Sequence, residues 1–315
     1  MSSIKPMLII ACCLLTACSD GPVQAYPVAA QGLLSGAVSA DGSHALIGSI
    51  HHGGSYWNVE KNERLFNWNH KAEGMSSLRA VALSGDGNRA VTCEEDTIVL
   101  WNTQTGKAEQ FWKTEDRIHS ISLNEKGSRA LMGLRNGTVR YFDLEGGVAI
   151  YNFEHQSEVR SAALTPDGRF GISAGDDMIA KVYDLSTGQI IREKTLSNQI
   201  KIVAISDSGR LAFASAQRDA SYVWDIQTDT VVFSKHNRVT NFTAVDFTDD
   251  EQLLSLGTFS GKILRLDAQT GQELKTWQAE PRKIYGSATS KAVLSLTDDG
   301  TNIVALTSDG MLEIF

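Results

Sequence analysis

The stretch 159–191, VRSAALTPDGRFGISAGDDMIAKVYDLSTGQII, decides the fold because it reads as short strands separated by tight turns. VRSAAL, GISA and the alternating IAKVYD are expected to be strands, while Pro166-Asp167-Gly168 and Asp176-Asp177 have turn chemistry. Ser186-Thr187-Gly188 then leads into a fourth strand. One such sheet cannot bury both of its faces, so copies of it must pack together.

Composition sets the outer limits. The chain has 315 residues, of which 42% are apolar and only 5 are proline, so it can bury a large core, and its length alone would suggest two domains. Its formal net charge is −8, from 29 basic and 37 acidic residues. An acidic surface disfavours nucleic acid as the main partner.

The first residues are expected to be a leader rather than part of the fold. Lys5 precedes an apolar run from Met7 to Leu15, which is too short to span a bilayer but suits a secretory signal. Leu15-Thr16-Ala17-Cys18 resembles the bacterial lipobox, which implies cleavage before Cys18 and lipidation of that residue. The alternative is an ordinary signal peptide. Ser19, where an Asp would imply inner-membrane retention, points to the outer membrane of a Gram-negative cell.

The other cysteines add no disulfide to the mature chain. Cys12 and Cys13 would leave with the signal, and Cys93 stands alone in an apolar strand. We expect Cys93 to be a small core residue.

Turns like the one at Asp167-Gly168 recur about every 41 residues, which is the period of a four-stranded propeller blade. The seven turns are Asp41-Gly42, Asp86-Gly87, Lys126-Gly127, Asp167-Gly168, Ser208-Gly209, Asp249-Asp250 and Asp299-Gly300. An aromatic or large apolar residue follows each turn at a nearly constant distance: Trp57, Trp101, Phe142, Tyr183, Trp224, Leu266 and Phe315. A solenoid could share this period, but it would need capping ends.

These features resemble the WD-repeat β-propeller family over nearly everything after residue 22. Trp224-Asp225 is the dipeptide that names the family, and the Asp-x-x-Thr-Gly turns at Asp184 and Asp267 are typical of it. The resemblance implies a buried hydrogen-bond network in each repeat, and one repeat matches it fully, with His155, Ser173, Asp177 and Tyr183.

Other repeats depart from this pattern. Arg218 and Ser260 stand where the turn Asp would be, and His70 and His236 are expected to lie too far from their strands. Most blades should therefore depend on apolar packing.

The seventh repeat ends at Phe315 after its third strand, which would leave an exposed edge. The segment from Val23 to Val28 can supply the missing outer strand. The expected organisation is a signal peptide at 1–17, a tether at 18–22 and an all-β, seven-bladed propeller at 23–315, closed by its N-terminal strand.

Two local motifs could carry chemistry. Gly171-Ile-Ser173-Ala-Gly175 matches the G-x-S-x-G pattern of serine hydrolases, but it lies between two strands rather than at a strand-to-helix elbow, so Ser173 is expected to be structural. His51-His52 could share a metal ion, but no carboxylate or Cys stands beside them at ligand spacing, and a solvated loop is the alternative. We predict no catalytic residue, no metal and no cofactor.

One column of residues at the start of the inner strands is rich in cations. Counting back from the last core residue of each inner strand gives Leu34, Arg79, His119, Arg160, Lys201, Thr243 and Ala292. In WD-repeat proteins this position opens onto the central channel at the top face, where arginines hold acidic segments of protein partners. The alternative is that these side chains extend into solvent.

Together these features predict a lipid-anchored, monomeric, non-catalytic scaffold for a protein partner in the periplasm. Analogy with the propeller lipoprotein of the outer-membrane barrel assembly machinery suggests envelope assembly. The alternative is a periplasmic propeller enzyme of the lactonase or quinone-dependent dehydrogenase type. The anchor should leave from the bottom edge of the seventh blade, with the top face directed away from the membrane.

Overall fold

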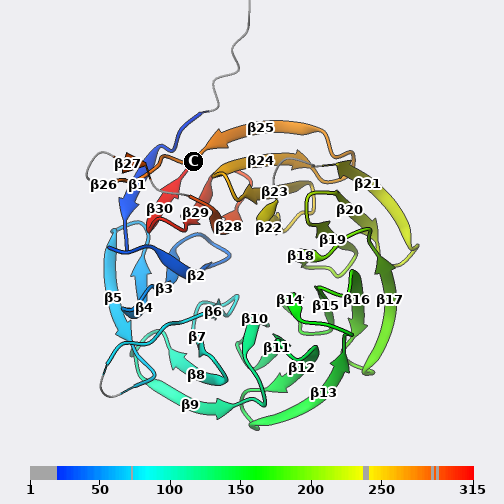
Figure 1. Cartoon of the computed structure of the whole chain (residues 1–315), viewed down its shortest axis with the longest axis horizontal. Helices are drawn as coiled ribbons and strands as arrows, with labels where there is room; N and C mark the ends of the chain where they lie inside the picture. Colours follow the sequence, from blue (N-terminus) through cyan, green and yellow to red (C-terminus); the bar gives the residue numbers. More distant parts are fainter. Residues whose placement is uncertain (1–19, 72–73, 237–240, 285–286, 289–290) are drawn as a thin grey trace, which may run out of the picture.

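The computed structural model describes residues 20–315 apart from 72–73, 237–240, 285–286 and 289–290. Its strands form seven four-stranded antiparallel sheets arranged as blades around a central axis (Figure 1). The predicted all-β, seven-bladed propeller is therefore confirmed. No helix that could span a bilayer occurs in the part of the chain that the structure describes.

Each blade runs outward from an inner strand a to an outer strand d. Blade 1 contains β2 (Leu33–Val38), β3 (His44–Ser49), β4 (Gly53–Asn58) and β5 (Glu63–Trp68). Blade 2 contains β6 (Ala80–Leu83), β7 (Arg89–Glu94), β8 (Thr97–Asn102) and β9 (Ala108–Lys113). Blade 3 contains β10 (Ile118–Leu123), β11 (Arg129–Leu134), β12 (Thr138–Asp143) and β13 (Val148–Glu154).

The following blades repeat this plan. Blade 4 contains β14 (Val159–Leu164), β15 (Phe170–Gly175), β16 (Ile179–Asp184) and β17 (Gln189–Thr195). Blade 5 contains β18 (Ile200–Ile205), β19 (Leu211–Ala216), β20 (Ala220–Asp225) and β21 (Thr230–His236). Blade 6 contains β22 (Phe242–Phe247), β23 (Leu253–Thr258), β24 (Lys262–Asp267) and β25 (Glu273–Gln278). A short hairpin, β26 (Lys283–Ile284) and β27 (Ser287–Ala288), precedes blade 7.

Blade 7 joins the two ends of the described chain. It contains β28 (Val293–Asp298), β29 (Ile303–Thr307), β30 (Met311–Ile314) and, as its outer strand, β1 (Gln24–Pro27). Gln24 pairs with Ile314 and Pro27 with Met311, and the amide of Val28 donates to the carbonyl of Gly310 at 2.8 Å. The prediction that the N-terminal segment completes the last blade is confirmed.

The recurring a–b turns follow from one side-chain arrangement. In blade 4 the Asp167 carboxylate accepts from the amide of Arg169 at 2.9 Å and from the hydroxyl of Thr165 at 2.6 Å. Gly168 then adopts a φ of 73°, which is unfavourable for residues with a Cβ. The same Asp-centred contacts recur in the a–b turns of blades 1, 2 and 6, which explains the sequence period.

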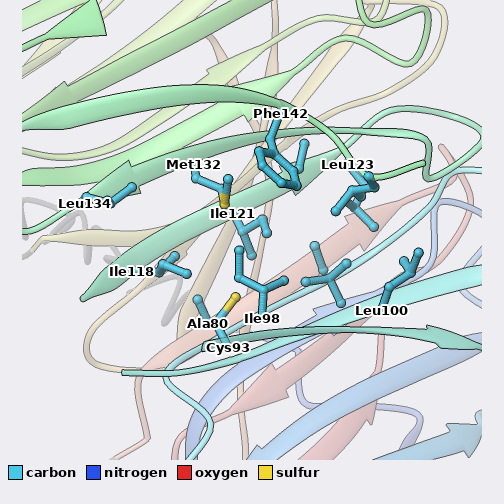
Figure 2. Packing of buried hydrophobic residues seen from close by; sticks show 14 residues of the cluster. Ala80, Cys93, Ile98, Leu100, Ile118, Ile121, Leu123, Met132, Leu134 and Phe142 are labelled. Atoms are coloured by element: carbon cyan, nitrogen blue, oxygen red, sulfur yellow. The ribbon is translucent and has the colours of Figure 1, made fainter. Parts of the chain in front are cut away.

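The apolar core lies between neighbouring blades. In the layer between blades 2 and 3, Cys93 and Ile98 face Ile118 and Met132 (Figure 2). Cys93 is fully buried, as predicted, and burial raises the pKa of its thiol far above the usual value. Each blade thus buries one face against the preceding blade and the other face against the following blade.

The chain before β1 also touches blade 6. The amide of Gln278 donates to the carbonyl of Asp20 at 2.9 Å, and Lys275 Nζ lies 3.3 Å from Asp20 Oδ2. Gln278 pairs with Lys262, directly after the b–c turn, so Asp20 lies near the b–c end of blade 6. We define the top face by the b–c turns and the entries to the inner strands, and the bottom face by the a–b and c–d turns. Strand β1 begins at the bottom of blade 7, as expected, because Gln24 pairs with Ile314 at the end of strand c. The point at which the anchor leaves the ring stays a prediction, because Cys18 lies outside the described residues.

Candidate functional site

Blade 4 brings together the four predicted network residues. His155 precedes β14, Ser173 lies in β15, Asp177 in the b–c turn and Tyr183 in β16. His155 Nδ1 lies 2.8 Å from Asp177 Oδ2, His155 Nε2 lies 2.8 Å from Ser173 Oγ, and Ser173 Oγ lies 2.7 Å from the Tyr183 hydroxyl. Burial lowers the pKa of His155, so the ring is neutral, with Nδ1–H donating to Asp177 and Nε2 accepting from Ser173.

Ser173, His155 and Asp177 are hydrogen-bonded in the same order as a hydrolase triad, but the position of Ser173 differs from that of a catalytic serine. Ser173 is 0% exposed, and its oxygen is also bonded to Tyr183, so a substrate cannot approach it. The network instead joins the entry of the blade to strands b and c.

A second network in blade 2 was missed by the sequence reasoning. His70 Nε2 lies 2.7 Å from Thr92 Oγ1, and His70 Nδ1 lies 2.9 Å from Thr97 Oγ1. Trp101 Nε1 donates to Thr92 Oγ1 at 2.8 Å. The expectation that His70 lies too far from its strand was wrong, because the longer connection into blade 2 returns it to the sheet. The signal was the pair Thr92 and Trp101, which are nine residues apart where Ser173 and Tyr183 are ten apart.

Blade 5 contains no equivalent network among the described residues. The residue of blade 5 equivalent to His155 is the buried Leu196, which has no polar side chain. His236, which precedes the inner strand of blade 6, is exposed, and its ring lies 3.8 Å from Asp219. Ser215 and Ser221 bond each other at 2.8 Å instead. The indole Nε1 of Trp224 is buried without a hydrogen-bond partner within the described part of the chain.

The residues that surround the top mouth of the channel lie at a β-bulge near the start of each inner strand. In six blades these bulge residues are Leu34, His119, Arg160, Lys201, Thr243 and Leu294. In blade 2 the equivalent residue is Arg79, directly before β6. The assignment of Ala292 to this column was therefore wrong; Leu294 occupies the position, and Ala292 is buried.

Each cation of this column is already close to a carboxylate. Glu95 lies 3.1 Å from Arg79 Nε and 2.6 Å from Arg117 Nε. Asp176 contacts Arg160 at 2.5 Å and Lys201 at 2.7 Å. Burial alone would raise the pKa of Asp176, but the hydrogen bonds from these two cations lower it below its usual value.

His119 differs from the other members. Burial, together with the charge of Arg160, lowers the pKa of its imidazole, so it is uncharged at neutral pH. We call Arg79, Arg117, Arg160, Lys201 and the carboxylates Glu95, Glu158 and Asp176 the top-face charged arc; its four cations and three anions sum to +1.

The bottom mouth of the channel has the opposite character. It opens into a cavity of about 940 Å³ that nine carboxylates line and no Lys or Arg lines: Asp41, Asp86, Glu125, Asp207, Asp246, Asp249, Asp250, Asp298 and Asp299. Shielding from solvent, with a smaller effect of Asp298, raises the pKa of Asp246 to about 8. Sequence reasoning missed this concentration because the residues come from turns far apart in the chain.

Two further groups bear on the chemistry. In the described part of the chain no three His, Cys, Asp or Glu side chains are grouped so that they could hold a metal ion, and His51 and His52 are exposed in the b–c turn of blade 1.

Glu313, in β30, is fully buried; its Oε1 accepts from the amide of Glu280 at 2.8 Å, while Oε2 has no partner among the described residues. Burial raises the pKa of Glu313 to about 7.

The similarity to known proteins centres on the repeat that contains the His155 network. The family model described as "WD domain, G-beta repeat" matches residues 147–184, which span β13 and the first three strands of blade 4, including His155 and its partners. The chain thus contains a match to the WD repeat within a seven-bladed propeller. It is also 32% identical over 99 residues to the WD repeat-containing protein SL1-17 of Schistosoma mansoni; the match covers 31% of the chain and 33% of that protein. The chain thus matches about a third of that relative's length.

The predicted lipidation residue, Cys18, lies outside the described residues, as does the signal peptide. Only residues 20–22 of the expected tether are described. Anchoring and location therefore remain predictions from the sequence.

Proposed function

We propose that this WD-repeat propeller is a scaffold held at the outer membrane of a Gram-negative cell by lipid on Cys18, and that it binds an acidic segment of a periplasmic partner during envelope assembly. The repeats support the scaffold role, since WD-repeat propellers typically bind protein partners. The leader sequence ending in Leu15-Thr16-Ala17-Cys18 supports the anchor.

The difference in charge between the two mouths of the channel is the observation that supports the top mouth as the binding surface. The top-face charged arc sums to +1, whereas the bottom mouth gathers nine carboxylates. An acidic segment is therefore attracted to the top mouth and repelled by the bottom one.

The existing ion pairs hold the cations in position without preventing binding. Arg79 and Glu95 are 44% and 47% exposed, and ion pairs with that much solvent contribute about 0 to 1 kcal/mol each. A partner carboxylate can therefore replace Glu95 or Glu158 at small cost, and the guanidinium it meets is already oriented.

Charge reversal at the arc tests the proposal. Crosslinking in intact cells, followed by mass spectrometry, should show loss of the main partner from the Arg79→Glu, Arg160→Glu double variant. A milder pair, Arg79→Gln with Arg160→Gln, should weaken capture. Lys107→Glu with Lys126→Glu, on exposed turns of the bottom face, is the matched control and should retain the partner. An unchanged partner list from the folded charge-reversal variant, checked by circular dichroism, would exclude the arc as the binding surface.

A further inference from the structure

A groove lies where the closing segment meets blade 1. It consists of two cavities of about 440 and 450 Å³ that share Val28, Ala29, Ala30 and Arg64 as lining residues. We call it the seam groove. Each cavity has the volume that binding sites for small organic molecules usually have. Neither mouth of the central channel contributes to it.

The chemistry of the seam groove centres on Arg64. Its guanidinium carbon lies 6.0 Å from the centre of the Trp57 ring, in the range of a cation–π contact. The Trp57 indole is in turn oriented by its Nε1–H, which donates to Ser55 Oγ at 2.8 Å. Arg64 is exposed and forms no ion pair with any residue that the structure describes, in contrast to the cations of the top-face charged arc.

The surroundings of Arg64 favour an anion. No Asp or Glu among the described residues lines either cavity, although the chain as a whole carries −8. Arg282 adds a second guanidinium at the wall, where it donates to the carbonyls of Ala29 and Ala30. Because Arg64 has no ion-pair partner and no lining carboxylate among the described residues, the groove favours an anion next to its guanidinium.

The remaining wall is apolar or neutral. Val28 and Trp57 line one cavity, and Met75, which is 57% exposed, lines the other together with His52. Asn67 and Asn69 supply neutral hydrogen-bonding groups to the same cavity as Met75. A ligand that fits must therefore combine a negative head with an apolar body.

We propose that the seam groove binds an organic anion whose carboxylate or phosphate head contacts Arg64 and whose apolar body packs against Trp57 and Met75. This site shares no lining residue with the top-face charged arc and is independent of the proposed scaffold function. Because Val28 to Ala30 directly follow β1, the bound ligand also holds the closing strand in place and raises the unfolding temperature of the ring.

Calorimetric titration of the full chain tests the proposal with probes that separate head from body. Octanoate and octyl phosphate should bind saturably and raise the unfolding temperature, and the tighter of the two identifies the preferred head. Acetate and inorganic phosphate should not bind detectably, and octanol should bind more weakly than either octyl anion. Equal binding of the small anions would show an adventitious ion only and would overturn the assignment.

Variants locate the site. Arg64→Ala should weaken octanoate or octyl phosphate binding about tenfold, because a charge-assisted contact is lost. Arg64→Lys should retain part of the affinity, Met75→Ala should weaken binding of the octyl chain, and Lys61→Ala, on the neighbouring turn, should have no effect. Unchanged affinity in Arg64→Ala, or no saturable binding of either octyl anion to the wild type, would refute the proposal.

Discussion

Two tryptophans at equivalent positions allow the hydrogen-bond networks to be weighed against apolar packing. Trp101 Nε1 donates to Thr92 Oγ1, whereas Trp224 Nε1 is buried without a partner among the described residues. Replacing either residue by Phe removes the same ring volume, at a cost of about 2 kcal/mol. In blade 2 the lost hydrogen bond adds about 1 kcal/mol, while in blade 5 removal of an unpaired buried donor returns about 1 to 3 kcal/mol.

We therefore expect Trp101→Phe to destabilise the ring by about 3 kcal/mol and Trp224→Phe to change the free energy of unfolding by about 1 kcal/mol or less, in either direction. Equilibrium urea unfolding should be followed by circular dichroism, because each substitution removes a fluorophore. The expected difference between the variants is about 2 to 4 kcal/mol and comes mainly from the indole N–H, because both substitutions remove the same atoms. Equal losses, or a larger loss from Trp224→Phe, would refute the assignment of an unpaired donor in blade 5.

Three further perturbations address the anchor, the closure and the buried carboxyl. Cys18→Ser should abolish lipid labelling and release the chain from the membrane fraction; continued membrane association of the unlabelled variant would contradict the lipobox prediction. Deleting 23–28 should cost about 4 kcal/mol, because ladder bonds and apolar contacts are lost together, and deleting 19–21 much less; equal melting temperatures would count against closure by β1. Burial raises the pKa of Glu313 from 4.5 to about 7, so its stabilising contribution is present at pH 4.5 and is lost as the pH rises through 7. The unfolding free energy of the wild type should therefore fall by about 3 kcal/mol over that window, and Glu313→Gln should remove most of this fall. Urea unfolding of both proteins at several pH values tests this, and the same slope in both pH profiles would contradict it.

The regular part of the chain was predictable because its turns repeat a local chemistry. An Asp that bonds two residues ahead and two behind forms the same turn wherever it occurs, so the period gave the number of blades. Similarly, the spacing of His155, Ser173, Asp177 and Tyr183 within one repeat indicated their network before the structure located it.

Local departures from the repeat caused the errors. Extra residues before blade 2 let His70 return to its sheet. In blade 7 the inner strand ends on Asp298 instead of an apolar residue, so counting back from its last apolar residues selected Ala292 instead of Leu294. The acidic bottom mouth and the seam groove were beyond sequence reasoning for another reason. Each gathers side chains from segments that only the closed ring brings together, such as Val28 and Arg64.

The contact of Asp20 with β25 determines how a mechanical load would enter the ring. Tension on the residues that precede Asp20 acts first on its bonds to Gln278 and Lys275, in blade 6. The four strands of blade 6, β22 to β25, are consecutive in the chain, so the turns between them share the force with the hydrogen bonds of the sheet. The four residues of β1, which close blade 7 without such connections, lie behind this clamp and are shielded from the pull until Asp20 detaches.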